Sequence, residues 1–480
     1  MEQRKHIHLI GICGTAMASL AGLLQQRGHK VTGSDNAAYP PMSDVLAALG
    51  IELKQPYNIT NLEPRPDLVI VGNAISRGNV ELEHVLDQRI PLQSMAATIH
   101  DEFLIGRDSF VVAGTHGKTT VTSLLAWIFE TASKTQPEFL PSFLIGGVAE
   151  NFGTSFALRD SRPFLLEGDE YDTAFFDKGP KFLHYFPDAL ILTHVEFDHA
   201  DIYRDLEEVK TAFKRLINLV PQRGRVVAFD ASANVDECIA RAFCKVERYG
   251  FTERAMWRLS EYKQHAEIAS WKVSRDGNPW AEFTMPLAGE HNALNATAAA
   301  ALAFGQGIEL EPIKQALRTF RSVKRRLEVR AEIAGVTFID DFAHHPTAIR
   351  ETLRALRSRY VGRRLIAVLE PRSNTLRRNV FEGELVESLM LADEVVLADV
   401  FQAANIPKAQ LLHPENVVAH LRDAGKPARL LPDADAIVTH LVPRLRGGDV
   451  VAILSNGGFG NIYEKLPRAF RQVQRTEALA

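Results

Sequence analysis

Short runs of apolar, often β-branched residues alternate along the chain with longer segments in which apolar residues recur at helical spacing. Parallel strands whose sheet is covered by helices on both faces give this alternation. The predicted fold class is therefore α/β. A chain of 480 residues exceeds the roughly 250 to 300 residues that one hydrophobic core accommodates. More than one domain is expected.

Two interruptions of the pattern divide the chain into three predicted domains. Residues 1–107 open with a strand, a glycine turn and a helix, which is the order of a Rossmann-like unit. Residues 108–322 begin after a charged stretch, and residues 323–480 begin at a basic segment and are predicted to be Rossmann-like again. The stretch 253–286 has no pattern that allows an assignment. Strands of the third domain are predicted at 337–339, 365–369, 394–397 and 449–454.

Composition and charge exclude several classes of protein. With 46% hydrophobic and 24% charged residues, the chain is typical of a globular protein. It lacks a run of the ~20 apolar residues that a membrane helix requires, and it lacks a signal-peptide pattern, so a cytoplasmic protein without a membrane partner is expected. A formal net charge of -4 disfavours nucleic acid as a partner. No feature indicates an obligatory protein partner. The three cysteines lack metal-site spacing and are expected to be reduced thiols.

The strongest chemical signal is Gly114-Thr-His-Gly-Lys-Thr-Thr120, which follows an apolar strand at 109–113 and precedes a helix. A glycine turn at this place directs backbone N–H groups at phosphate oxygens, and the helix N-terminus adds positive potential. This predicts a central P-loop ATPase domain in which Lys118 contacts the phosphates of ATP and Thr119 is a ligand for Mg²⁺. The loop is shorter than a general phosphate loop, because Val112 occupies the position of the first glycine. A tight turn with an exposed lysine is the alternative interpretation.

Two acidic segments, Glu167-Gly-Asp-Glu-Tyr-Asp172 and Thr193-His-Val-Glu-Phe-Asp-His199, each follow a further apolar strand. Ligands bind at the carboxyl ends of the strands in α/β sheets, and Mg²⁺ takes carboxylates from proteins. Asp169 or Glu170 is therefore a candidate metal ligand. A solvated acidic loop is the alternative for either segment.

The first domain contains a second phosphate-binding turn, Gly11-Ile-Cys-Gly14. Its glycines allow a diphosphate to approach, and Asp35, at the end of the next strand, is placed to accept a hydrogen bond from a ribose hydroxyl. However, Cys13 takes the position of the second glycine in the dinucleotide fingerprint and would crowd a pyrophosphate there. An NAD-dependent oxidoreductase is therefore a distant alternative. A nucleotide-sensing regulator without turnover is another, but it would not need metal ligands.

Together these segments resemble the Mur ligase family, in which the phosphate loop, a Glu-x-Asp-Glu segment and a Glu-x-Asp-His segment occur in this order. Three further segments resemble the family's motifs: Gly289-Glu-His-Asn-Ala-Leu-Asn295, Arg325-Arg-Leu327 and Asp340-Asp-Phe-Ala-His-His-Pro346. The resemblance covers all three domains and implies catalytic roles for Lys118, Glu170 and His199, with metal bound by Thr119, Glu170 and His199. It implies that ATP is bound by Gly114, Thr115, His116, Gly117, Lys118, Thr119, Thr120, Asn292, Asn295, Arg326 and Asp341.

The reaction that the resemblance implies forms an amide bond with ATP and Mg²⁺ as cofactors. A substrate carboxylate attacks the γ-phosphate of ATP to give an acyl phosphate, and an amine then displaces phosphate. The chain departs from several family members at Phe213, where those members carry a carbamylated lysine. Whether Lys210 or Lys214 replaces that lysine is left open.

The substrates are also implied by resemblance, and the first is UDP-N-acetylmuramate. Its UDP-sugar is expected to bind in the N-terminal domain, at Gly14, Thr15, Ser34, Asp35, Asn73 and Arg77. Taken alone, Arg77 is equally well explained as a solvated loop cation.

The second substrate is expected to bind in the C-terminal domain. The segments 11–15, 370–375 and 455–460 resemble the branch of the family that recycles a preformed murein tripeptide, L-alanyl-γ-D-glutamyl-meso-diaminopimelate. Arg372, Ser373 and Asn374 are expected to line the peptide site, with Arg372 pairing a carboxylate, or else only to shape the loop. Free L-alanine is the alternative acceptor.

Overall fold

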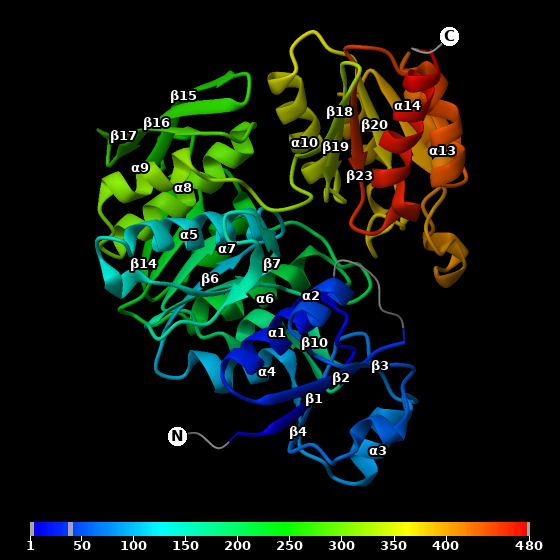
Figure 1. Cartoon of the computed structure of the whole chain (residues 1–480). Coiled ribbons are helices and arrows are strands. Elements are labelled where there is room, and N and C mark those ends of the chain that lie inside the picture. The colour runs from blue at the N-terminus through cyan, green and yellow to red at the C-terminus, as the bar shows by residue number, and fades with distance from the viewer. Residues whose placement is uncertain (1–3, 37–41, 478–480) are drawn as a thin grey trace.

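The computed structural model describes residues 4–36 and 42–477, which form three α/β lobes (Figure 1). Each lobe has its own main sheet, and these sheets lie within residues 6–94, 108–285 and 328–454. The predicted three-domain α/β fold is confirmed, while the exact boundaries near residues 107 and 323 stay predictions. Within the described residues, no helix is long and apolar enough to span a bilayer.

The N-terminal lobe has a five-stranded parallel sheet in the order β3-β2-β1-β4-β5. Helix α1 is apolar because it packs against both this sheet and the central lobe, where Ser19 Oγ lies 2.7 Å from Ser155 Oγ. A Cβ on Gly22 would overlap the Phe156 ring, so glycine allows this close approach. The elements are β1 (His6–Ile10), α1 (Thr15–Gln26), β2 (Lys30–Ser34), α2 (Met42–Ala48), β3 (Leu53–Lys54), β4 (Leu68–Val71), α3 (Val80–Asp87), β5 (Leu92–Ser94) and α4 (Met95–Ile99).

The central lobe has a ten-stranded sheet in the order β17-β16-β15-β14-β13-β12-β6-β9-β7-β8. Its middle strands are parallel and buried on both faces, as the continuous apolar runs predicted. The elements are β6 (Asp108–Ala113), α5 (Lys118–Ala132), β7 (Ser142–Ala149), β8 (Thr154–Ala157), β9 (Pro163–Gly168), β10 (Asp172–Ala174), β11 (Asp177–Pro180), β12 (Ala189–Leu192), α6 (Leu206–Leu219), β13 (Arg225–Phe229), α7 (Ala233–Ile239), β14 (Lys245–Gly250), β15 (Trp257–His265), β16 (Ile268–Arg275), β17 (Asn278–Met285), α8 (Glu290–Gly305) and α9 (Leu310–Arg318).

The stretch 253–286, for which the sequence allowed no assignment, forms the antiparallel strands β15, β16 and β17. Trp257 and Trp271 point to the buried face, whereas the next residue along each strand, Arg258 and Lys272, is exposed. Register shifts in both strand pairs interrupt this alternation. The interruptions explain why a regular period was not apparent in the sequence.

The C-terminal lobe has a six-stranded sheet in the order β18-β19-β23-β20-β21-β22, in which only the edge strand β18 is antiparallel to its neighbour. The predicted strands are present, with ends that differ by one or two residues. The elements are β18 (Glu328–Ile333), β19 (Val336–Asp341), α10 (Pro346–Arg359), β20 (Leu365–Leu369), α11 (Glu382–Leu389), β21 (Glu394–Ala398), α12 (Pro414–Asp423), β22 (Ala428–Leu431), α13 (Ala434–Leu441), β23 (Val450–Leu454) and α14 (Ile462–Glu477).

The chain crosses from the central to the C-terminal lobe at residues 322–327. Val323 forms a β-bridge with Ala149 of the central lobe, and Leu327 N donates to Asp341 Oδ2 at 2.8 Å in the C-terminal lobe. Non-glycine residues rarely adopt positive φ. Three residues of the crossing do so, with φ of 72°, 62° and 51°: Ser322, Arg325 and Leu327.

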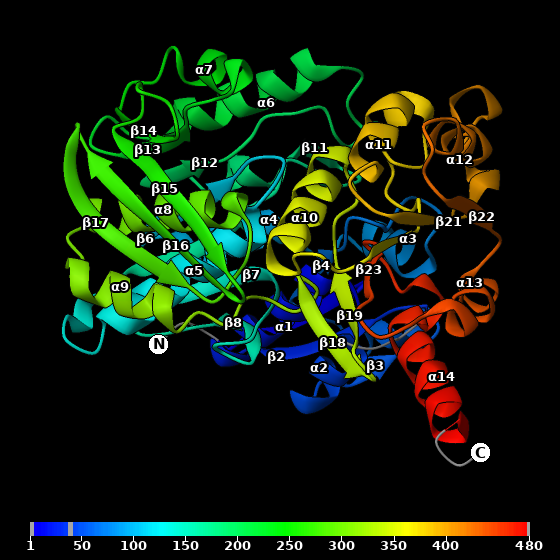
Figure 2. The same ribbon diagram turned by 90° about the horizontal axis from the view of Figure 1, so that it is seen from above.

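Apolar contacts continue from lobe to lobe. One core cluster combines residues of the central and C-terminal lobes, and a second combines residues of the N-terminal and central lobes. Figure 2 shows α10 at the boundary, where it contacts β15 of the central lobe and β20 of its own lobe. The carboxyl ends of strands from two sheets therefore meet beside α10.

Candidate active site

The phosphate loop connects β6 to α5. Gly114 has φ of 130° and Gly117, the N-cap of α5, has φ of 81°, a conformation that favours glycine. A Cβ on Gly114 would overlap Thr193 Oγ1, and one on Gly117 would lie 2.8 Å from Asn295 Oδ1. The loop thus keeps its path, and its N–H groups at the helix start, only with glycine at both positions.

Lys118 and Thr119 begin α5 and contact the first acidic segment. Lys118 Nζ lies 2.7 Å from Glu170 Oε2, and Thr119 Oγ1 donates to Glu167 Oε1 at 3.1 Å. Burial alone would lower the pKa of Lys118, but the carboxylates of Glu170 and Asp169 outweigh it and raise this pKa. The lysine is therefore a fixed positive charge at the start of the helix.

The second acidic segment adds His199 to this cluster. The ligand atoms of Asp169, Glu170 and His199 lie within 4.8 Å of one another, with His199 Nε2 3.6 Å from Glu170 Oε1. Burial opposes the charge of His199, but hydrogen bonding to Glu170 and the charge of Asp198 raise its pKa to about 9. The sequence had placed these residues on different segments, and the fold brings them together into one cluster of oxygen and nitrogen donors.

A second cluster lies on the other side of the phosphate loop. His116 Nε2 lies 3.1 Å from Glu196 Oε2, which also accepts a hydrogen bond from Thr347 Oγ1 at 2.7 Å. His345 Nδ1 is 3.7 Å from the same oxygen. Burial raises the pKa of Glu196, but hydrogen bonding and charge from His116 outweigh burial and hold it at about 2. This cluster joins the central lobe to the N-terminus of α10.

Residues at the start of α8 and Arg326, in the crossing between the central and C-terminal lobes, also lie near the phosphate loop. Asn292 and Asn295 lie in the first turns of α8, 3.4 Å apart between Oδ1 and Nδ2, and Asn295 faces Gly117. Arg326 Nη2 is 3.5 Å from Thr119 Oγ1. The structure therefore brings these three predicted residues to the phosphate loop.

Asp341 has a different environment. It is buried, and its two carboxylate oxygens accept hydrogen bonds from Leu327 N at 2.8 Å, Ala343 N at 2.9 Å and Thr352 Oγ1 at 3.1 Å. These bonds fasten the linker and the start of α10 to β19. In this arrangement Asp341 orders the backbone that carries Arg326, and its predicted contact with ATP stays a prediction.

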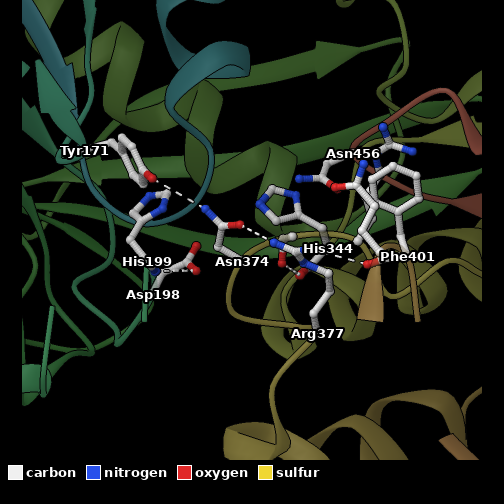
Figure 3. A pocket seen from close by; sticks show the side chains of 11 residues that line it. Tyr171, Asp198, His199, His344, Asn374, Arg377, Phe401 and Asn456 are labelled. Atoms are coloured by element: carbon white, nitrogen blue, oxygen red, sulfur yellow. Dashed lines mark hydrogen bonds between the residues drawn. The ribbon is translucent and has the colours of Figure 1, made fainter. Parts of the chain in front are cut away.

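A cavity of about 360 Å³ opens between the central and C-terminal lobes (Figure 3). Every lining residue follows the carboxyl end of a strand, namely β9, β12, β19, β20, β21 or β23. Tyr171, Asp198 and His199 come from the central lobe. The C-terminal lobe contributes His344, Arg372, Ser373, Asn374, Arg377, Phe401, Gln402 and Asn456.

The three predicted peptide-binding residues all line this cavity. The guanidinium of Arg372 stacks on Phe401 at 3.7 Å from the ring centroid and lies 3.5 Å from Glu370. Asn374 Nδ2 donates to Asp201 Oδ2 at 2.7 Å, and Arg377 Nη2 donates to Asn374 Oδ1 at 2.6 Å. Arg372 and Arg377 give this wall of the cavity two cationic groups, which suits an anionic ligand.

The glycine turn of the N-terminal lobe is organised around Asp35. Its Oδ2 accepts from Cys13 N at 2.9 Å, and its Oδ1 accepts from Tyr57 OH at 3.3 Å. Gly14 and Thr15 are exposed at the start of α1. The half-buried Asp35 thus holds the turn that precedes the exposed residues Gly14 and Thr15.

The other predicted UDP-sugar residues lie in different surroundings. Ser34 is fully buried, and its hydroxyl donates to Glu81. Asn73 donates to the Asp172 carbonyl of the central lobe. Arg77 is 68% exposed and pairs with Glu83 at 2.9 Å. The geometry brings Gly14, Thr15 and Asp35 together. The exposure of Arg77 and its ion pair with Glu83 fit the alternative of a solvated loop cation, and its contact with the UDP-sugar stays a prediction.

Comparison with known proteins identifies the family. The family models for the Mur ligase family catalytic domain, the Mur ligase middle domain, and the Mur ligase glutamate ligase domain match residues 6–102, 112–303 and 325–457. The chain belongs to the Mur ligase family. The predicted resemblance is thereby confirmed.

Three relatives within the Mur ligase family are informative. The chain is 44% identical to the UDP-N-acetylmuramate–L-alanyl-γ-D-glutamyl-meso-2,6-diaminoheptandioate ligase of Escherichia coli, over 96% of this chain and 97% of that protein. It is 30% identical to the UDP-N-acetylmuramate–L-alanine ligase of Caldanaerobacter subterraneus, over 97% of each chain. The crystal structure of a murein peptide ligase from Psychrobacter arcticus is similar with a TM-score of 0.73 and 34% identity, covering 97% and 99% of the two chains.

Lys210, close to Phe213 in the sequence, is held by two carboxylates. Phe213 is fully buried against Phe182, with ring centroids 5.3 Å apart. Lys210 pairs with Glu207 and Glu237, and hydrogen bonds to these carboxylates raise its pKa. Because an ammonium group that stays protonated is a poor nucleophile for carbon dioxide, the geometry does not support carbamylation of Lys210.

Several residues of this Mur ligase site were missed in the sequence. Tyr171, Arg377, Phe401 and Asn456 line the cavity, and Tyr57 contacts Asp35. Tyr171 lies next to a predicted metal ligand, and Arg377 lies three residues beyond a predicted peptide-binding residue. These two residues could have been predicted from their closeness in the sequence to a motif. Tyr57 could not, because its loop comes close to Asp35 only in the folded chain.

Proposed function

We propose that this chain is an ATP-dependent ligase that joins the tripeptide L-alanyl-γ-D-glutamyl-meso-diaminopimelate to UDP-N-acetylmuramate, giving ADP and phosphate. The observation that carries the proposal is the cationic cavity that faces His199 across the interface of the central and C-terminal lobes. The tripeptide carries several carboxylates, and Arg372 and Arg377 suit them. Free L-alanine is the alternative acceptor, but it would use only a small part of this cavity.

The three lobes divide the work in this proposal. We assign residues 1–107 to the UDP-sugar, residues 108–322 to ATP, and residues 323–480 to the peptide. The carboxylate of the muramate sugar would then meet ATP at the phosphate loop, and the peptide amine would approach from the cavity. ATP and UDP-sugars are cytoplasmic metabolites, so the enzyme is proposed to act there.

The reaction proceeds in two steps. A carboxylate oxygen of UDP-N-acetylmuramate attacks the γ-phosphorus of ATP, the bond to the β-phosphate oxygen breaks, and ADP leaves. The amine nitrogen of the peptide then attacks the acyl carbon, phosphate leaves with the bonding electron pair, and the nitrogen loses a proton. Lys118 offsets the charge that develops on the transferring phosphoryl group.

The donor set also suits Mg²⁺. Thr119 offers a hydroxyl oxygen, and Asp169 and Glu170 offer carboxylate oxygens, which are the donors that Mg²⁺ prefers. His199 offers an imidazole nitrogen beside them. Thr119, Glu170 and His199 are proposed to hold it. Bound there, Mg²⁺ would neutralise phosphate oxygens. Closure of the cavity by the C-terminal lobe keeps water from the acyl phosphate.

The test is phosphate release from ATP with Mg²⁺ and UDP-N-acetylmuramate, with the tripeptide and free L-alanine compared as acceptors. We expect release that depends on the tripeptide, and a product mass equal to the sum of both substrates less one water. Phosphate release that depends on L-alanine instead would show that free L-alanine is the acceptor. No release with either acceptor would contradict the ligase proposal.

A further inference from the structure

We propose that His116, Glu196 and His345 form a binding site for a transition-metal ion of the Zn²⁺ type. The three side chains come from the phosphate loop, from the segment after β12, and from the residue before α10. The site therefore spans the central and C-terminal lobes. It is separate from the cluster at Asp169, Glu170 and His199, and it goes beyond the proposed ligase reaction.

The separations of the ligand atoms suit a tetrahedral ion. Ligand atoms at ~2.0–2.1 Å from Zn²⁺ lie about 3.3 Å from one another. Glu196 Oε2 lies 3.1 Å from His116 Nε2 and 3.7 Å from His345 Nδ1, and all three atoms lie within 4.8 Å of one another. Small side-chain adjustments would bring the three atoms to metal-binding distances.

The type of ligand distinguishes this cluster from the first one. Two imidazoles and one carboxylate, with a water molecule in the fourth position, form a common ligand set for Zn²⁺, whereas Mg²⁺ prefers oxygen ligands. His345 is buried, and its Nδ1 lies 3.7 Å from Glu196 Oε2. Borderline-soft ions should therefore select this cluster over the oxygen-rich one.

The surroundings already orient the ligands. His345 Nε2 lies 3.2 Å from the Phe197 carbonyl, which only accepts hydrogen bonds, so Nε2 carries the proton and Nδ1 carries the lone pair. Thr347 N donates a long bond of 3.3 Å to that lone pair, and a bound metal ion would replace this bond. Thr347 Oγ1 binds Glu196 Oε2. Such outer contacts fix the direction of metal ligands. An ion bound here would link the phosphate loop to the N-terminus of α10 and hold the two lobes together.

The experiment is a titration of the full-length protein with Zn²⁺ in competition with a chromophoric chelator, in excess Mg²⁺ to occupy the oxygen-rich cluster. The wild-type protein is expected to bind one Zn²⁺. His345→Asn removes the imidazole but keeps a side chain that caps α10 well. We expect this variant to lose affinity by about 100-fold or more, since changes at supporting residues alone cost about 10–100-fold.

Two further variants make the result specific. Glu196→Gln should also weaken Zn²⁺ binding, and it serves if His345→Asn fails to fold by circular dichroism. His194→Asn is the matched control, because its ring lies 6.1 Å from that of His116 without supplying a ligand atom, and it should bind Zn²⁺ like the wild type. Wild-type affinity in both folded ligand variants, or no saturable Zn²⁺ site in the wild type, would overturn the proposal. Because only metal binding is measured, the result does not depend on the ligase reaction.

Discussion

The phosphate loop and the glycine turn of the N-terminal lobe both suit phosphate groups, but they do so by different means. Around the loop, Lys118 and His199 each lie within ion-pair distance of the buried Glu170. Around the turn, the contacts of Asp35 among the described residues are hydrogen bonds from Cys13 N, Tyr57 OH and Asn36 N. The phosphate loop is suited to phosphate groups by the charged side chains around it, and the glycine turn is suited to them by its backbone conformation.

The difference matches the proposed tasks of the two regions. Charge that develops during phosphoryl transfer needs fixed opposite charge nearby, in a site from which water is excluded. A UDP-sugar that is only held needs hydrogen bonds that discriminate it from other ligands. Substitutions should therefore change turnover in the first region and substrate affinity in the second.

Replacing Lys118 should have the largest effect. Lys118→Met removes the cation that pairs with Glu170 and faces the phosphates, so kcat is expected to fall by at least about 10²–10³-fold, as for loss of other electrostatic stabilisers. Phosphate release measures this. Lys134→Met is the matched control, because Lys134 lies beyond the far end of the same helix, over Trp127. An unchanged kcat in Lys118→Met would contradict the claim that charge around the phosphate loop stabilises phosphoryl transfer.

The cavity between the lobes should show an intermediate effect. Arg372→Lys keeps the charge but loses the planar group that stacks on Phe401 and binds a carboxylate through two N–H groups. Loss of a charged hydrogen bond costs about 1.5–3 kcal/mol, so KM for the tripeptide should rise by about 10–100-fold while KM for ATP is unchanged. Arg378→Lys, which alters an arginine outside the cavity lining, should leave both constants unchanged. A rise in KM for ATP alone would contradict the assignment.

Asp35 should affect substrate affinity without affecting chemistry. Asp35→Asn weakens an acceptor for a ribose hydroxyl, and KM for UDP-N-acetylmuramate is expected to rise by about tenfold, with kcat unchanged. Steady-state kinetics with varied UDP-N-acetylmuramate checks this. Asp44→Asn, an exposed carboxylate on α2, is the control. A fall in kcat with constant KM would show that this region contributes to the chemical step.

The smallest effect is expected for Tyr57→Phe. Its hydroxyl donates a long hydrogen bond of 3.3 Å to Asp35 and contributes to the position of that carboxylate. One neutral hydrogen bond of this kind is worth about 0.5–1.5 kcal/mol, so KM for UDP-N-acetylmuramate should rise by about threefold. Tyr360→Phe, in the C-terminal lobe, is the control. A larger rise in KM for UDP-N-acetylmuramate in Tyr57→Phe than in Asp35→Asn would contradict this supporting role and indicate that Tyr57 itself contacts the substrate.

Local patterns in the sequence predicted the parts of the molecule that depend on neighbouring residues. The strand before Gly114 and the helix after Lys118 were both predicted, because a phosphate loop needs that order. The strands β20 and β21 were predicted from apolar runs. The acidic segments were placed correctly at strand ends, since parallel strands direct their carboxyl ends to one edge.

Contacts between distant residues were beyond such patterns. Ser34 was expected at the ligand, but its hydroxyl binds Glu81, a partner 47 positions away. The contact of Asn374 with Asp201 joins two lobes and depends on how they pack. The hydrophobic pattern of one segment does not indicate which other segment it packs against. The burial of Ser34 and the full set of residues that line the cavity could therefore be found only in the structure.

The crossing at residues 322–327 has a mechanical consequence. Each left-handed non-glycine residue costs roughly 1–2 kcal/mol, and Ser322, Arg325 and Leu327 are kept in that conformation by contacts on both sides. Relaxation of this segment would recover part of that energy when the contacts break. While these contacts persist, the crossing therefore opposes rotation of the C-terminal lobe relative to the central lobe. Once the contacts are lost, the relaxation of its backbone favours separation of the two lobes.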